Sequence, residues 1–339
     1  MDVNIKSDRQ IWIDTLKGIG IIIVVAGHIG GIIPESFGLI RMPLFLFVAG
    51  FLFKPSPDWK GYLYKKIIHL LVPYICFLFL IYTPQAIMNV HKGNDTWIEA
   101  IARPLIGGPF LFGWTAVFWF ITCLFFVQQL MNLLLNRYSE KRVIIIMAIS
   151  LAISYINSEI FPKVWLPWSL NAVFAAAPIF YVGYLYKKYV MGLNSYYYMI
   201  LLLILLVSLS YPGNSYNIKT NFYGIPIITF VSAIFAIVAL TYIAKMLEKR
   251  SWSSKPFTQL SKGSMIIMYL HQPLQYSANT YLSMHNPYIR LVIVISVCLI
   301  AYYLISQTTV GRGLLLGSVN DFKRVLSKNP YPKIVTSKS

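Results

Sequence analysis

The feature that most constrains this chain is a series of apolar runs, each close to the length needed to cross a membrane. About ten such runs follow one another, at roughly 11–33, 39–53, 67–90, 114–135, 142–158, 168–187, 195–211, 223–245, 263–283 and 288–306. Only 12% of the residues are charged, whereas a soluble domain averages about a quarter. The sequence therefore predicts an all-α polytopic membrane protein of about ten transmembrane helices.

The charges in the loops predict which side of the membrane each loop faces. If the N-terminus is cytoplasmic, ten crossings return the C-terminus to the cytoplasm. In that arrangement 23 of the 29 Lys and Arg residues lie on the cytoplasmic side, and the others are Arg41, Lys92, Arg103, Lys163, Lys219 and Arg290. Because cytoplasmic loops carry an excess of Lys and Arg, we predict that both termini are cytoplasmic.

Composition also limits the domain organisation and the partners. We expect a transmembrane domain over residues 1–306 and a basic cytoplasmic tail over 307–339. The net charge of +18 does not indicate a nucleic-acid partner, because the basic residues lie between the apolar runs. The three cysteines lie inside apolar runs and show no metal-binding spacing, so no metal is expected. The longest outer loop, about 91–113, is either a cap over an outward opening or a simple loop.

Two ionisable residues, Lys17 and His28, lie inside the first apolar run, IWIDTLKGIGIIIVVAGH. Ionisable groups within a membrane are costly and are candidates for function. The separation of eleven residues makes about three helical turns, which puts both side chains on one face, ~16 Å apart along the axis. The glycines on or near this face are Gly20, Gly27, Gly30 and Gly31. The pattern predicts a slot with a cation at its cytoplasmic mouth and a base near mid-membrane.

Each of these residues also has an ordinary structural explanation. Lys17 alone is typical of a lysine that reaches the membrane surface and sets topology. His28 alone is consistent with a hydrogen-bonding role between packed helices. Asp14 is placed to pair with Lys17 at i,i+3. The position of Lys17 and His28 on one face favours the functional interpretation.

Two further polar residues are catalytic candidates. His271 lies about eight residues into its run, in GSMIIMYLHQP, with Ser264 two turns before it. It is either a structural histidine or a second polar group near mid-membrane. Arg41 opens the second run on the outer side, where it either holds a substrate oxygen or marks the membrane edge.

A basic cluster opens the third run, in YLYKKIIHLLVPY (62–74). Lys65 and Lys66 are consistent with membrane anchoring or with attraction to anionic lipid. The alternative is that they bind phosphate beside Lys17. In this cluster His69 is placed at the membrane interface.

These segments, taken in order, resemble the membrane acyltransferase 3 family. The resemblance is carried by a basic residue, ten residues and then His in the first span, matched by Lys17 and His28, followed by RMPLFLFVAGFLF (41–53) and the basic cluster. FWFITCLFF (118–126) and MYLHQP (268–273) resemble later landmarks of the family. The resemblance extends over nearly the whole chain and is strongest over 10–75. Short chains of this type are often labelled fucose 4-O-acetylase-like, a label that does not assign the acceptor.

The resemblance implies a bacterial cytoplasmic-membrane enzyme that moves an acyl group, usually acetyl, from acyl-CoA to a hydroxyl of a cell-surface or secreted glycan, or of a lipid-linked sugar. The phosphates of CoA would bind Lys17, Lys65 and Lys66, with Asp14 beside them. His28 would be the general base, or would carry the acyl group itself. Arg41 or His271 would stabilise the oxyanion.

A transporter or exporter of a polysaccharide or small molecule is the rival class. Ten helices with buried polar residues suit a transporter as well. Alternating access does not, however, require a base at the end of a slot lined by cations.

Overall fold

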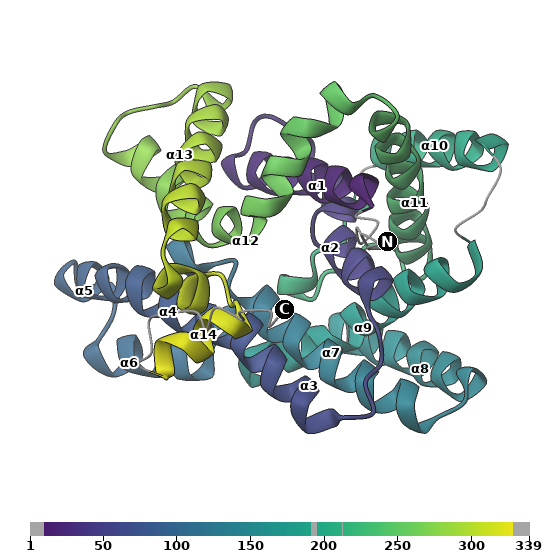
Figure 1. The fold of residues 1–339 in the computed structure, drawn as a ribbon, viewed down its shortest axis with the longest axis horizontal. Coiled ribbons are helices and arrows are strands. Elements are labelled where there is room, and N and C mark those ends of the chain that lie inside the picture. The colour runs from purple at the N-terminus through teal and green to yellow at the C-terminus, as the bar shows by residue number, and fades with distance from the viewer. Residues whose placement is uncertain (1–9, 191–194, 212, 328–339) are drawn as a thin grey trace, which may run out of the picture.

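The computed structural model describes residues 10–190, 195–211 and 213–327, and over these residues the chain is helical. The helices are α1 (Ile11–Ile29), α2 (Gly38–Leu52), α3 (Trp59–Lys66), α4 (Val72–Phe77), α5 (Thr83–His91), α6 (Trp97–Ile106), α7 (Trp119–Arg137), α8 (Glu140–Glu159), α9 (Leu170–Leu185), α10 (Ser195–Ser210), α11 (Ile228–Glu248), α12 (Ser251–Thr280), α13 (Pro287–Gln307) and α14 (Val319–Leu326) (Figure 1). No strand is present in the described part of the chain. The all-α membrane fold predicted from the sequence is confirmed.

Eight of the described helical stretches are long and apolar enough to cross a membrane. They are Ile11–Ile29, Glu35–Leu52, Trp59–His91, Gly113–Arg137, Glu140–Glu159, Pro167–Tyr189, Ile228–Glu248 and Pro287–Gln307. Helices α10 and α12 occupy the other two predicted runs. The count of about ten spans and the cytoplasmic position of both termini stay predictions.

The end of the first helix differs from the predicted run, 11–33. Helix α1 ends at Ile29, and the next two residues, Gly30 and Gly31, have φ values of 77° and 72°. Only glycine adopts this conformation without strain, so the pair ends the helix directly after His28. His28 therefore lies in the last turn of α1, next to a non-helical segment.

The helices pack as two apolar groups. One group centres on α2, α7, α9 and α11, and the other joins α1, α12 and α13. Helix α1 lies along α12, and a Cβ on Gly18 would come within 2.3 Å of the Phe257 carbonyl oxygen. Met42, Phe45 and Leu270 pack against both groups. The seam between the two groups is where the polar residues of α1, α2 and α12 meet.

Two glycines allow α2 and α9 to cross with their backbones in contact. A Cβ on Gly50 would lie 1.8 Å from the Phe180 carbonyl oxygen, and a Cβ on Gly183 would lie 2.0 Å from that of Phe47. Small residues of this kind let membrane helices approach closely. The contact is reciprocal, so it fixes α2 against α9 at one register.

We expect Gly50→Ala to destabilise the protein by about 1–3 kcal/mol, because the added methyl group must push two backbones apart. Thermal unfolding in detergent measures the effect. Gly263→Ala is the matched control, since the nearest atom to its Cβ is the far end of the Leu299 side chain, at 2.9 Å, which can rotate away. Equal melting temperatures for the two variants would show that the α2–α9 crossing is not tightly packed.

The outer loop predicted over 91–113 contains helix α6. Thr96 caps the N-terminus of this helix and forms a reciprocal capping box with Glu99. Directly before it, Asp95 pairs with Arg103, and this hydrogen bond lowers the pKa of the Asp95 carboxyl. Trp97, Ile98, Ile101 and Leu105 are exposed large apolar residues on α6. An exposed apolar face of this kind is typical of a helix lying at a membrane surface.

The described part of the predicted tail is folded. Residues 311–315 form a π-helical turn (Gly311–Leu315), which packs against α4 and α13, and α14 follows it. In Figure 1 this yellow segment lies beside the dark blue α3 and α4. Residues 328–339 of the predicted tail lie outside the described residues.

Candidate active site

A cavity of about 670 Å³ opens along the seam and is lined at one end by lysines. We call it the lysine cavity. The lysines are Lys17, Lys54, Lys65 and Lys66, and among the described residues no carboxylate lines it. Its walls come from α1, α2, α3, α7 and α12, and they are mostly apolar. A volume of this size is within the range of pockets that bind small molecules and cofactors.

Two helical stripes lead along the cavity toward the histidines. On α1 the cavity is lined by Lys17, Ile21 and Val24, at the spacing of one helical face, and the next residue on that face is His28. On α12 it is lined by Ser264 and Met268, and the next position on that face is His271. The lysine cavity therefore ends about one helical turn short of both histidines.

His28 and His271 form a pair between α1 and α12. Their ring centroids are 5.1 Å apart, with the planes at 71°, which is an edge-to-face arrangement. His271 is fully buried and His28 is half-buried. The sequence predicts each histidine near mid-membrane, and the packing of α1 on α12 brings them together.

Backbone hydrogen bonds define which nitrogen of each ring is available. Nδ1 of His28 lies 3.0 Å from the Val24 carbonyl, and Nδ1 of His271 lies 2.7 Å from the Ile267 carbonyl. Because a carbonyl oxygen can only accept, each Nδ1 carries a proton and each neutral ring keeps a lone pair on Nε2. Among the described residues Nε2 of His271 has no hydrogen-bond partner.

A second cavity, of about 820 Å³, lies beyond the histidines at the C-terminal end of α1. We call it the loop cavity, because residues 30–36 and 210–222 supply most of its lining. Gly27 and Arg41 lie at its inner end. Its polar lining includes Glu35, Ser36, Asn214, Ser215, Asn217 and Thr220. The two cavities thus approach the histidine pair from opposite ends of α1.

The Arg41 side chain crosses α1 directly beside His28. A Cβ on Gly27 would lie 2.6 Å from one guanidinium nitrogen of Arg41, so a larger residue there would push the Arg41 side chain out of this position. Arg41 and Lys219 are near enough to act on His28 electrostatically. Lys219 lies outside the spans, and burial lowers its pKa to about 8.

The other predicted site residues divide into two groups. Lys17, Lys65 and Lys66 all line the lysine cavity, whereas Asp14 is not among the described residues that line it. Asp14 accepts a hydrogen bond of 2.7 Å from Ser261 and so joins α1 to α12. His69, placed at the interface by the sequence, also lines the cavity.

Sequence reasoning missed several lining residues. Lys54, Tyr62, Gln128 and Val319 contribute to the lysine cavity. Lys54 lies two residues after the end of α2, and it lines the same cavity as Lys17 near the start of α1. That signal is present in the sequence. The position of Val319 cannot be inferred from the sequence, because it depends on how the C-terminal segment folds back.

A buried arginine ties together the ends of the two histidine-bearing helices. Arg290 of α13 is 7% exposed. It donates a hydrogen bond of 3.2 Å to the carbonyl oxygen of Ile29, the last residue of α1. It also donates a hydrogen bond to the Asn279 side chain of α12. Arg290 therefore fixes the spacing of α1 and α12 close to the histidine pair.

We expect Arg290→Met to lower kcat by roughly 10- to 100-fold, because small displacements of catalytic groups have effects of this size. The KM for the acyl donor should change little, since Arg290 is remote from the lysines. Arg290→Lys should recover part of the activity, since it still donates to Ile29. Steady-state kinetics on purified protein measure both parameters. A rise in KM with kcat intact would exclude this positioning role.

The helices, the two cavities and the polar residues between them are those of a multi-pass membrane protein with a candidate site inside it. A family model described as an acyltransferase domain matches residues 10–306, so the chain belongs to the acyltransferase 3 family. No curated protein and no solved structure matches it. The chain is thus a membrane acyltransferase, which takes an acyl donor and an acceptor, and the transporter alternative finds no support. The described residues contain no group of three or more side chains suited to a metal ion.

Proposed function

We propose that this acyltransferase moves an acyl group, usually acetyl, from acyl-CoA to a hydroxyl of a cell-surface or secreted glycan, or of a lipid-linked sugar, at the bacterial cytoplasmic membrane. The observation that carries the proposal is the pair of cavities that approach one histidine pair from opposite ends. One cavity is cationic at its mouth and apolar along its walls, and the other has a polar lining. The two linings suit different substrates.

The lysine cavity suits acyl-CoA. Lys17, Lys65 and Lys66 supply point charges for the phosphate groups, and Lys54 adds a fourth. The pantetheine arm runs along the stripe of Ile21 and Val24 and brings the thioester toward His28. Asp14 does not contact the donor in this scheme. It accepts a hydrogen bond from Ser261 of α12 and so holds α1, which carries Lys17, in position.

The loop cavity suits a sugar hydroxyl. Its serine, asparagine and threonine side chains offer both hydrogen-bond donors and acceptors, as a polyhydroxyl ligand requires. Glu35 adds an acceptor at the same cavity. The acceptor hydroxyl then reaches Nε2 of His28 from the end opposite to the donor.

His28 acts as the general base in this scheme. Its Nε2 lone pair takes the proton of the acceptor hydroxyl while the oxygen attacks the thioester carbonyl. A carbon–oxygen bond forms, the carbon–sulfur bond breaks, and the proton passes to the departing CoA thiolate. The Val24 carbonyl holds Nδ1–H and so keeps the lone pair on Nε2.

Arg41 and His271 have different roles in this scheme. Arg41 is always charged and lies beside His28 over Gly27, so it stabilises the oxyanion of the tetrahedral intermediate. Neutral His271 has its one N–H bonded to Ile267 and has no second proton to donate to an oxyanion. Its ring edge instead holds the orientation of the His28 ring.

Radiolabelled acetyl-CoA with purified protein and membrane glycan tests the proposal. We expect the protein to bind acetyl-CoA and to transfer label to the glycan. Binding without transfer would point to a different acceptor. If acetyl-CoA neither binds nor loses its acetyl group, the donor assignment is wrong.

A further inference from the structure

We propose that residues 308–327 form a clamp that closes one side of the donor site and contacts bound acyl-CoA at the lysine end of the cavity. We call these residues the C-terminal clamp. The inference rests on the proposed function of the lysine cavity. The clamp lies beyond the residues matched by the family model, 10–306, so the family match does not assign it a role.

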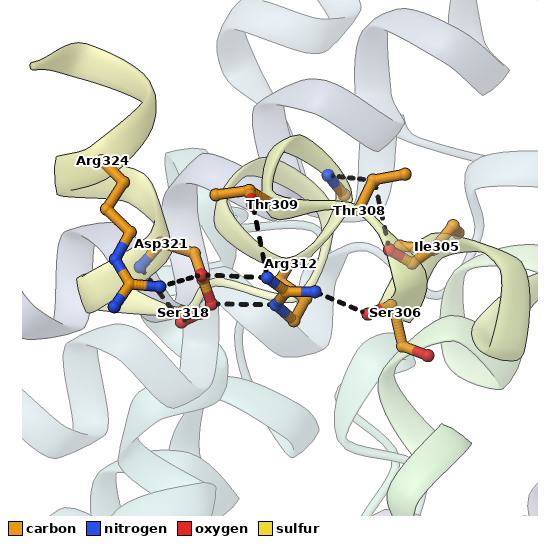
Figure 2. Close-up of polar contacts among 9 residues, drawn as sticks. Ile305, Ser306, Thr308, Thr309, Arg312, Ser318, Asp321 and Arg324 are labelled. Atoms are coloured by element: carbon orange, nitrogen blue, oxygen red, sulfur yellow. Dashed lines mark hydrogen bonds and ion pairs between the residues drawn. The ribbon is translucent and has the colours of Figure 1, made fainter. Parts of the chain in front are cut away.

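One arginine holds the clamp in its folded form. Arg312 donates from Nε to Asp321 Oδ2 at 3.1 Å and from Nη2 to Asp321 Oδ1 at 3.3 Å (Figure 2). Its Nη1 donates a hydrogen bond of 2.9 Å to the Ser306 carbonyl oxygen at the end of α13. Ser318 caps the N-terminus of α14, and its hydroxyl donates a hydrogen bond of 2.7 Å to Asp321 Oδ2. The hydrogen bonds from Arg312 and Ser318 lower the pKa of Asp321, so the pair is charged at neutral pH.

A backbone contact docks the clamp on the third span. Gly317 has a φ of 65°, and a Cβ there would lie 2.5 Å from the His69 carbonyl oxygen. Nδ1 of His69 lies 3.3 Å from the Gly317 carbonyl, which accepts its proton. His69 lines the lysine cavity, so the docking point lies at the cavity itself.

The segment after this docking point brings α14 to the cavity. Val319 lines it together with Lys65 and Lys66. Lys323, one turn further along α14, lies 5.8 Å over the ring of Tyr64. The clamp thus adds an apolar side chain to a rim of cations. This combination suits the nucleotide end of CoA, which presents a flat base and phosphate groups together.

Cysteine protection tests the contact directly. We would replace Cys76, Cys123 and Cys298 by alanine and introduce V319C, then measure maleimide labelling with and without desulfo-CoA, which has no thiol of its own. At a ligand concentration ten times Kd, we expect labelling of V319C to slow about tenfold. L326C, on the same helix at a position 65% exposed, is the matched control and should label at an unchanged rate.

Direct binding of desulfo-CoA to the wild type separates the two proposals. If the wild type binds and V319C binds but is not protected, the clamp is excluded and the proposed function stands. If V319C folds but loses binding while L326C keeps it, the contact is supported. If the wild type does not bind, the donor assignment fails, and the clamp fails with it.

A second variant tests the Arg312–Asp321 pair without changing a residue that lines the cavity. Asp321→Asn removes the charge that pairs with Arg312, and a pair of this kind is worth up to about 1 kcal/mol. We expect the Kd of desulfo-CoA to rise about fivefold when that energy is lost from donor binding. Glu140→Gln, which removes the exposed Lys188–Glu140 pair, is the control and should leave the Kd unchanged. An unchanged Kd in Asp321→Asn would overturn the role of the ion pair.

Discussion

Replacing His28 by alanine should reduce acyl transfer roughly 10²- to 10⁴-fold, the contribution expected of a general base. The loss should fall on kcat, because His28 lies one turn beyond the residues that line the lysine cavity. Acetyl-CoA should still bind with nearly unchanged affinity. Transfer of label from radiolabelled acetyl-CoA to membrane glycan measures kcat, and equilibrium dialysis measures binding.

His91 provides a matched control for this substitution. It also lies in the last turn of its helix and bonds through Nδ1 to the carbonyl four residues back, at 2.8 Å. It is exposed and lines neither cavity that flanks the histidine pair. His91→Ala should therefore keep full activity. Comparable activity in the His28 and His91 variants would remove His28 from the mechanism.

Lys17→Met should weaken acyl-CoA binding roughly 10- to 100-fold, because a hydrogen bond to a charged group contributes about 1.5–3 kcal/mol. Met keeps most of the apolar stem, so packing of α1 should survive. The effect should appear in Kd and KM for the donor, with a smaller change in kcat. Isothermal titration with desulfo-CoA measures the affinity, and its salt dependence should be smaller in the variant than in the wild type.

Lys262→Met is the control for Lys17→Met. Lys262 is exposed on α12 and is not among the described residues that line the lysine cavity. Its replacement should leave the affinity unchanged. If both variants lose the same affinity, the effect comes from the overall charge of that end of the protein and not from Lys17.

The sequence carries enough information to predict the helices and one wall of the site. Ionisable side chains stand out in an apolar run, and the helical period fixes which of them share a face. The spacing of Lys17 and His28 is therefore sufficient to place them on one stripe. The structure confirms the all-α fold, and it places Ile21 and Val24 on the stripe between them.

The contacts between distant helices could not be predicted in this way. The pairing of His28 with His271 depends on how closely α1 approaches α12, and that approach depends on Gly18 against the Phe257 backbone. A single glycine in an apolar run does not reveal its partner. The C-terminal clamp could not be predicted from the sequence either, because α14 has only eight residues and forms no apolar run.

The thickness of the layer between the two cavities has a consequence for membrane integrity. Val24 lines one cavity and Gly27 lines the other, and three residues correspond to about 4.5 Å of helix. Under the proposed function, donor and acceptor react across this layer, and only the acyl group passes from one side to the other. The side chains of this layer then have to exclude water, because a water-filled opening there would let protons pass from one side of the membrane to the other.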